Sequence, residues 1–253
     1  MHVTSTEIKN NLGKYLKICK NEQVLITKNG KKYALLLSYP DNESTSSIGE
    51  SKLVYGTNPK QNQFITYKEF LEITENSEQR FELIDGRIYL LGSPGYTHQD
   101  ILGNLYIVFW QYFKEHEACK PFLSPFDIEL FRQPMQAIRL LMEDDTNVVQ
   151  PDLMVLCNYK KDINEQDRYK GTPTLVAEIL SNSSRGKDQV KKLDLYMESG
   201  IEEFWLIDPK YQTITVHLFK DYDITYSKQY ALGQTACSQC FHNLAVDSTT
   251  IFT

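Results

Sequence analysis

The sequence lacks the features that mark secreted and membrane-spanning proteins. Its 253 residues contain no run of about 18 apolar residues, and no apolar segment follows the N-terminal methionine. The five cysteines are an odd number scattered along the chain, which favours reduced thiols over a disulfide framework. Cys237 and Cys240 form a lone C-x-x-C pair, which is weak evidence for zinc. These absences predict a cytoplasmic protein without a membrane segment.

A strong charge of one sign is also missing, because the net charge is only −6. The charge is unevenly distributed. Residues 1–40 hold seven lysines and two acidic residues, a net charge of +5, which leaves −11 for the rest of the chain. Hydrophobic residues make up 41% of the sequence, enough to build a core. The composition therefore predicts a basic N-terminal segment joined to a larger acidic globular part.

The basic segment has the pattern of a small α+β module. Apolar residues at helical spacing predict a helix within residues 5–20. Residues 23–28 and 31–38 predict two strands, and Asn29-Gly30 between them is a strong signal for a hairpin turn. A module of about 40 residues buries too little apolar surface to be stable alone. We therefore expect it to dimerise or to dock onto another domain.

The order of these features resembles the Phd/YefM antitoxin fold, through the runs Val3 to Glu7, Leu12 to Leu16 and Val24 to Lys31. The resemblance implies a homodimer or higher homo-oligomer that binds operator DNA, and it adds a toxin as a candidate partner. A lysine-rich surface that is merely solvated explains the same residues equally well. In the DNA-binding interpretation, the phosphate-contacting residues are Lys9, Lys14, Lys28, Lys31 and Lys32.

Residues 41–63 separate this module from the rest of the chain. They are rich in Ser, Asn, Gly and Thr and have no hydrophobic period, which predicts a linker. We therefore expect a module at 1–40, a linker at 41–63 and a large domain at 64–253. Within that domain, Asp85-Gly86 predicts a hairpin turn, and residues 98–113 have the apolar spacing of a long helix.

Two carboxylates are placed at apolar strands of the large domain. Glu178 lies within the apolar run 174–181, and Asp152 follows Pro151 at the start of the apolar run 153–157. An unpaired ionised carboxylate in a buried strand costs several kcal/mol, so a cation, a metal ion or a raised pKa must compensate Glu178. If the two strands are neighbours, the two acids converge, and their oxygen atoms suit Mg²⁺ or Mn²⁺.

These acids belong to an ordered series of motifs. The series runs from Arg80 to Gly86, through Ser93-Pro94 and His98, to Pro151-Asp152, Glu178-Ile179-Leu180, Asp188, Lys192, Tyr196 and the segment from Gly200 to Trp205. It resembles the Uma-two family of endonucleases in the PD-(D/E)xK restriction-endonuclease-like superfamily, over roughly residues 63–230. One departure is Leu180, which stands where the superfamily usually has lysine. The resemblance implies that the following helix supplies the lysine instead, and the spacing Asp188-xxx-Lys-xxx-Tyr assigns this position to Lys192.

The resemblance implies a Mg²⁺-dependent (or Mn²⁺-dependent) DNA endonuclease. Asp152, Glu178 and the carbonyl oxygen of Ile179 would bind the metal, and Lys192 would stabilise the transition state or orient water. Glu82 is a candidate auxiliary ligand or water-orienting group, and a glutamate facing water at the edge of the hairpin is equally compatible with the pattern. The further auxiliary candidates are His98, Asp188 and Tyr196.

Three alternatives stay open at this point. The acids and Lys192 form the metal site, or they form a buried ion pair that only joins strands. Either Lys192 faces the acids, or it faces solvent and Lys191 or no lysine lies at the metal, since helical spacing allows both orientations. The protein cleaves DNA, or it is a non-catalytic DNA-binding, antitoxin-like regulator with a degenerate nuclease fold. In either case the fold class is α/β (α+β), a restriction-endonuclease-like mixed sheet flanked by helices, with the acid-bearing strands central.

Overall fold

The computed structural model describes residues 2–4, 7, 14–15, 24–28, 31–36, 64–75, 77–116, 118–132, 146–163, 169–181 and 191–252. The chain divides into two compact units, residues 1–58 and 59–253. The predicted linker at 41–63 lies outside the described residues, as do Lys9 and Asp188. No helix in the described ranges is long and apolar enough to cross a membrane.

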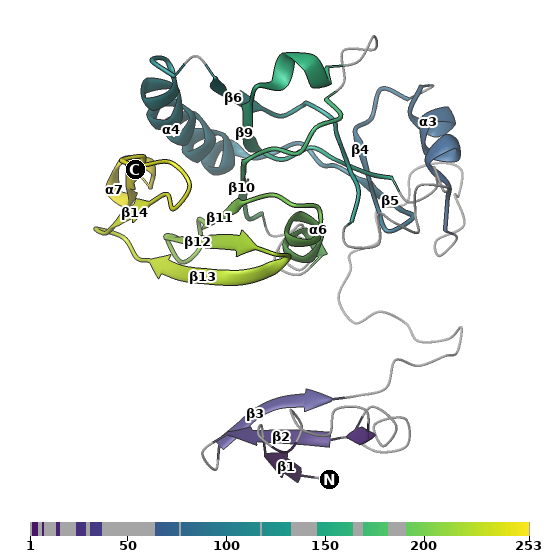
Figure 1. Cartoon of the computed structure of the whole chain (residues 1–253), viewed down its shortest axis with the longest axis vertical. Helices are drawn as coiled ribbons and strands as arrows, with labels where there is room; N and C mark the ends of the chain where they lie inside the picture. The colour runs from purple at the N-terminus through teal and green to yellow at the C-terminus, as the bar shows by residue number, and fades with distance from the viewer. Residues whose placement is uncertain are drawn as a thin grey trace. The chain divides into compact units, whose positions relative to one another are not determined.

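The N-terminal unit contains a three-stranded sheet among its described residues. Its strands are β1 (His2–Thr4), β2 (Val24–Lys28) and β3 (Lys31–Leu36) (Figure 1). β1 pairs with β2 in parallel, and β2 pairs with β3 in antiparallel fashion, which confirms the predicted pair of strands. Tyr15 is buried with Val3 and Val24, and its hydroxyl donates to Glu7 at 2.7 Å.

The larger unit is built on a sheet of six described strands in the order β13-β12-β11-β10-β9-β6 (Figure 1). β10 and β11 are parallel, whereas the other neighbours are antiparallel, which confirms the predicted mixed sheet. β9 and β10, which carry the acidic motifs, are interior strands of this order. The strands are β6 (Cys119–Leu123), β9 (Leu153–Cys157), β10 (Leu175–Ile179), β11 (Glu203–Asp208), β12 (Thr213–Lys220) and β13 (Asp223–Tyr230).

A second sheet, which the sequence pattern did not separate from the first, has the order β5-β4-β8-β7. Its strands are β4 (Phe81–Ile84), β5 (Arg87–Leu90), β7 (Ile128–Leu130) and β8 (Asn147–Val149). The predicted turn between β4 and β5 is confirmed, because Asp85 and Gly86 have positive φ angles of 50° and 69°. The segment 150–152 carries the chain from β8 in this sheet to β9 in the first.

Helices cover the sheets from different sides (Figure 1). The long helix α4 (Tyr96–Phe113) confirms the helix predicted at 98–113 and packs on one face of the six-stranded sheet. Helix α6 (Leu193–Glu198) and the second sheet contribute to a separate hydrophobic cluster on the opposite face. Three shorter elements complete the described helices: α3 (Tyr67–Glu75), the 3₁₀ helix η2 (Tyr159–Asp162) and α7 (Ser248–Ile251).

The cysteines correct one expectation from the sequence. Cys119 and Cys157 are directly opposite each other on β6 and β9 and form a disulfide, so the prediction of reduced thiols is wrong for this pair. The number of cysteines does not indicate which of them the pairing of two strands places opposite each other. Cys237 and Cys240 are free thiols near the small sheet formed by β14 (Thr235–Cys237) and β15 (Ala245–Asp247).

The C-x-x-C segment binds a buried carboxylate. Glu203 accepts hydrogen bonds from the backbone N–H groups of Gln239 at 2.6 Å and Cys240 at 2.8 Å, and from the Ser238 hydroxyl at 3.1 Å. The indole N–H of Trp205 donates to its other oxygen. Burial, followed by the charge of Glu203, raises the pKa of the Cys240 thiol, so this thiol stays protonated. The arrangement gives the segment a structural role that does not require zinc.

Candidate active site

Strand alternation directs Glu178 to the face of the six-stranded sheet opposite α4. Leu175, Ala177 and Ile179 pack toward α4, so Glu178, between the last two, faces the opposite side. On β9, Leu153 packs toward α4 and Met154 toward α6. Asp152 directly precedes β9 and contacts both His98 of α4 and the backbone of β10.

The register of β9 against β10 sets the two acids at the same end of these strands. Ala177 is opposite Leu153 in the last pair of the ladder, and Glu178 follows Ala177 while Asp152 precedes Leu153. Asp152 contacts β10 directly, because the backbone N–H of Ile179 donates to its Oδ2 at 2.8 Å. In an extended strand the N–H and C=O of one residue point to the same side. The carbonyl of Ile179 therefore faces the side on which Asp152 lies.

Lys192 is located between two buried carboxylates. Its Nζ lies 2.6 Å from Glu178 Oε1 and 2.9 Å from Glu82 Oε1, and all three side chains are at most 4% exposed. Glu82 also accepts a hydrogen bond from the backbone N–H of Gln150 at 3.1 Å. The interpretation of Glu82 as a water-facing residue at the hairpin edge is therefore wrong. The reason is that the second sheet covers this side of the first, which strand patterns alone do not reveal.

Tyr196 contributes a fourth buried polar group. Its hydroxyl donates to Glu178 Oε1 at 2.6 Å. Burial, followed by the neighbouring charge of Glu178, raises the pKa of Tyr196 well above its usual value. The hydroxyl therefore stays protonated and remains a hydrogen-bond donor to the carboxylate. Glu82, Glu178, Lys192, Tyr196 and Asp152 are called the carboxylate–lysine cluster from here on.

The neighbouring lysine takes a different position. Lys191 is exposed, and its Nζ donates to the Tyr89 hydroxyl at 2.6 Å while it lies 4.9 Å from the centre of that ring. Of the two lysines left open by the sequence, Lys192 is the one that contacts Glu178. Asp188 lies outside the described residues. The segment that leads into α6 thus directs adjacent lysines to different surroundings.

His98 reaches the cluster from the first turn of α4. Its Nε2 lies 3.1 Å from Asp152 Oδ2, and the two side chains are 13% and 16% exposed. Its Nδ1 is buried and has no hydrogen-bond partner among the described residues. Asp152 Oδ2 thus contacts His98 and the Ile179 N–H, whereas Asp152 Oδ1 has no partner in the described ranges. The second oxygen is positioned to accept a ligand.

The cluster gathers three carboxyl side chains around one lysine. Glu82 and Glu178 contact Lys192, and Asp152 contacts His98 and the Ile179 N–H. Since like charges in a poorly hydrated region repel strongly, a divalent cation is the natural complement. The described part of the chain contains no group of three or more His, Cys, Asp and Glu side chains arranged to bind a metal ion. Two carboxylates and a backbone carbonyl remain a set of hard oxygen donors that fits Mg²⁺ or Mn²⁺.

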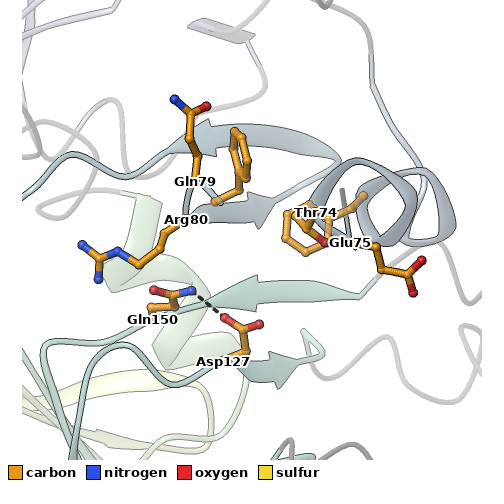
Figure 2. Close-up of a pocket in the computed structure, with 8 residues that line it drawn as sticks. Thr74, Glu75, Gln79, Arg80, Asp127 and Gln150 are labelled. Carbon is orange, nitrogen blue, oxygen red and sulfur yellow. Dashed lines mark hydrogen bonds between the residues drawn. The ribbon is translucent and has the colours of Figure 1, made fainter. Parts of the chain in front are cut away.

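A polar hollow adjoins the cluster on the side of the second sheet. Figure 2 shows this space of about 200 Å³, which is lined by Phe70, Thr74, Glu75, Gln79, Arg80, Phe81, Asp127 and Gln150. Gln150 Nε2 donates to Asp127 Oδ1 at 2.7 Å, the contact dashed in Figure 2. Sequence reasoning assigned no role to Gln150, although it directly precedes Pro151-Asp152. Its place at the crossing between the sheets could not be inferred from local pattern.

The lysines of the basic module are only partly described. Lys14 is exposed, with its Nζ 5.5 Å from the centre of the Tyr15 ring. Lys28, Lys31 and Lys32 belong to the hairpin strands β2 and β3, and Lys9 lies outside the described residues. Their proposed phosphate contacts, and the boundaries 1–40, 41–63 and 64–253, stay predictions.

Comparisons with known proteins agree with this two-part organisation. The Phd/YefM model, described as an antitoxin of type II toxin–antitoxin systems, matches residues 1–60. An uncharacterized protein of Synechocystis sp. is 26% identical over 150 residues, covering 57% of this chain and 75% of the relative. The crystal structure of a protein described as a putative nuclease belonging to DUF820, from Anabaena variabilis, has a TM-score of 0.58 at 21% identity. It covers 74% of this chain and 97% of its own length.

The family assignment rests on the larger unit. The Uma2 model, described as "putative restriction endonuclease", matches residues 67–246. This range includes the β4–β5 hairpin, α4, β9, β10 and α6, and so every member of the carboxylate–lysine cluster. The chain therefore belongs to the Uma-two family, with a mixed α+β fold of the restriction-endonuclease-like type and an antitoxin-like segment at its N-terminus.

Proposed function

We propose that the larger unit is a Mg²⁺- or Mn²⁺-dependent DNA endonuclease whose metal ligands are Asp152, Glu178 and the carbonyl oxygen of Ile179. The observation that carries this proposal is the hydrogen bond from the Ile179 N–H to Asp152 Oδ2, which sets Asp152 against the strand whose Glu178 contacts the buried Lys192. Membership of a family described as putative restriction endonucleases supports hydrolysis of nucleic acid.

The residues of the cluster have separate tasks in this mechanism. A bound divalent ion supplies positive charge at the scissile phosphate and makes water acidic enough to attack at neutral pH. Lys192 adds a fixed positive charge that stabilises the developing negative charge on the phosphate oxygens. The Tyr196 hydroxyl and the Lys192 ammonium orient Glu178, and His98 and the Ile179 N–H orient Asp152. Glu82 keeps Lys192 in place from the second sheet.

Metal dependence is the direct test of this proposal. Supercoiled plasmid, duplex oligonucleotides and single-stranded oligonucleotides are incubated with the protein in Mg²⁺, in Mn²⁺ and in EDTA, and the products are resolved on gels. We expect cleavage in either metal, loss of cleavage in EDTA and recovery when excess metal is restored, because EDTA removes the ion that would activate the attacking water. Cleavage that persists in EDTA contradicts the metal site, and absence of cleavage on all substrates favours a non-catalytic protein.

A second candidate function belongs to the N-terminal segment. The match of residues 1–60 to an antitoxin model favours a module that dimerises the chain, binds DNA and takes a toxin as a partner. The described strand pairing β1-β2-β3 is compatible with such a module. In this alternative the protein is a DNA-binding regulator, and the carboxylate–lysine cluster serves only to join strands.

Deletion of residues 1–40 tests the module. We expect the truncated chain to bind duplex DNA more weakly than the full chain in a gel-shift titration, with a smaller dependence of affinity on salt concentration. The physical reason is that seven lysines are removed together with two acids, which lowers the number of phosphate charges that can be neutralised. Unchanged affinity and an unchanged salt slope would exclude a role of the module in binding DNA.

A further inference from the structure

A cavity with a volume of about 600 Å³ is lined in part by Gln150, whose backbone N–H donates to Glu82 of the carboxylate–lysine cluster. It lies beside the smaller polar hollow of Figure 2, and Asp127 and Gln150 line both. The volume is in the range of sites that bind small organic ligands. The residues that line this cavity, called the aromatic pocket, are Phe122, Pro125, Phe126, Asp127, Gln150, Tyr159 and Ile163.

Three aromatic rings form one part of the pocket wall. The centre of the Phe122 ring lies 5.7 Å from that of Phe126 and 5.0 Å from that of Tyr159. All three rings pack against the hydrophobic cluster on the α6 face of the sheet and remain partly exposed. The Tyr159 hydroxyl has no hydrogen-bond partner among the described residues. Flat aromatic faces at the edge of a cavity are the surfaces on which proteins stack unpaired nucleobases.

The polar part of the wall presents acceptors. Gln150 Nε2 donates to Asp127 Oδ1, which fixes the orientation of the amide because the reverse orientation would set two oxygens against each other. Gln150 Oε1 then has no hydrogen-bond partner in the described ranges, and neither has the second oxygen of Asp127. Both atoms accept hydrogen bonds, and Gln150 Oε1 is buried. A ligand that satisfies them must present N–H donors.

The aromatic pocket is tied to the proposed cleavage site by the backbone. The N–H of Gln150 donates to Glu82 Oε1 at 3.1 Å, and the N–H of Ser124 donates to the carbonyl oxygen of Asp152 at 3.2 Å. Gln150 is separated from Asp152 by Pro151 alone. A nucleotide whose phosphate lies at Asp152 therefore has the pocket within reach of its base.

We propose that the aromatic pocket binds an unstacked nucleobase with adjacent N–H donors, guanine above the others, next to the phosphate that is cleaved. This proposal rests on the proposed nuclease function and specifies its substrate as DNA with an unpaired guanine. Guanine presents an N–H and an amino group side by side, which match a carboxylate and an amide oxygen. Thymine presents one N–H between two carbonyl oxygens, and these oxygens repel Asp127. A base inside a duplex cannot reach the pocket without leaving the stack.

Binding without cleavage tests the pocket separately from the chemistry. Fluorescent oligonucleotides of thymidines with one central G, A, C or T are titrated in EDTA, and affinity is measured by anisotropy. We expect the G oligonucleotide to bind about tenfold more tightly than the all-T oligonucleotide, as for a well-formed bidentate contact to a base. Asp127→Asn should remove the preference for G, and Phe126→Leu should weaken the G oligonucleotide by about tenfold through lost stacking.

Tyr211→Leu is the matched control for loss of an aromatic ring. Tyr211 is 65% exposed on the turn between β11 and β12 and does not line the pocket, so this variant should bind as the parent does. Circular dichroism confirms that each variant is folded. Equal affinity for all four oligonucleotides, no binding to any, or an unchanged G preference in Asp127→Asn overturns the pocket. A protein that prefers G but cleaves nothing contradicts the nuclease chemistry alone, and one that cleaves without a base preference contradicts the pocket alone.

Discussion

Replacing Asp152 with asparagine is expected to lower Mg²⁺-dependent cleavage by about a thousandfold, which corresponds to the several kcal/mol that a correctly placed ion contributes. The substitution keeps the size of the side chain and leaves an oxygen that can accept from the Ile179 N–H, now 2.8 Å from Asp152 Oδ2. It removes one negative charge and one hard ligand. The fold should persist, because the side chain is 16% exposed and the backbone contacts are unchanged.

Two measurements separate the loss of a ligand from a loss of structure. Cleavage rates are compared over a range of Mg²⁺ concentrations, and the melting temperature is recorded with and without Mn²⁺. Metal binding should raise the melting temperature of the parent protein and not that of the variant. Asp194→Asn is the matched control, because Asp194 is exposed on α6. Full cleavage by Asp152→Asn would show that the acids only join strands.

Local sequence rules accounted for the parts of the fold that depend on neighbouring residues. The hairpin at Asp85-Gly86 follows from the need for positive φ at both positions, and the structure has it. The length of α4 follows from apolar spacing, although the helix begins at Tyr96 rather than 98. The strand bearing Glu178 follows from an apolar run that a single acid interrupts.

Long-range packing could not be derived in the same way. Glu82 is buried because the second sheet lies over the face of the first sheet that carries Glu178. The local sequence pattern does not indicate that the chain passes from one sheet to the other between Val149 and Leu153. The disulfide between Cys119 and Cys157 depends on the register of β6 against β9. The pairing of Asp127 with Gln150 has the same origin, since the two residues flank β7 and β8 at one end of their antiparallel pairing.

This chain differs from the usual PD-(D/E)xK motif in the origin of its lysine, Lys192, which also contacts Glu82. Leu180 stands where a lysine is usual, and the structure brings in Lys192 from the segment before α6. A lysine on the same strand as the acid would be positioned by that strand alone. Lys192 instead contacts β10 through Glu178 and the second sheet through Glu82, so its position depends on three elements packing together.

Replacing Lys192 with methionine is expected to destabilise the larger unit by about 3–5 kcal/mol and to abolish cleavage, because two buried carboxylates lose their common cation. Urea unfolding measures the change. Lys191→Met, one residue away and exposed, should change stability by no more than about 0.5 kcal/mol.

The double variant Lys192→Met/Glu82→Gln distinguishes the two contributions of this lysine. Removing the charge of Glu82 should recover part of the lost stability, since Glu82 no longer adds a second negative charge beside Glu178, and contacting residues are coupled by about 0.5–3 kcal/mol. Cleavage should not recover, because the positive charge beside Glu178 is still absent. If Lys192→Met is as stable as Lys191→Met, the lysine does not compensate the buried acids. If the double variant cleaves DNA, Lys192 does not take part in the chemistry and serves only to offset the charge of Glu82.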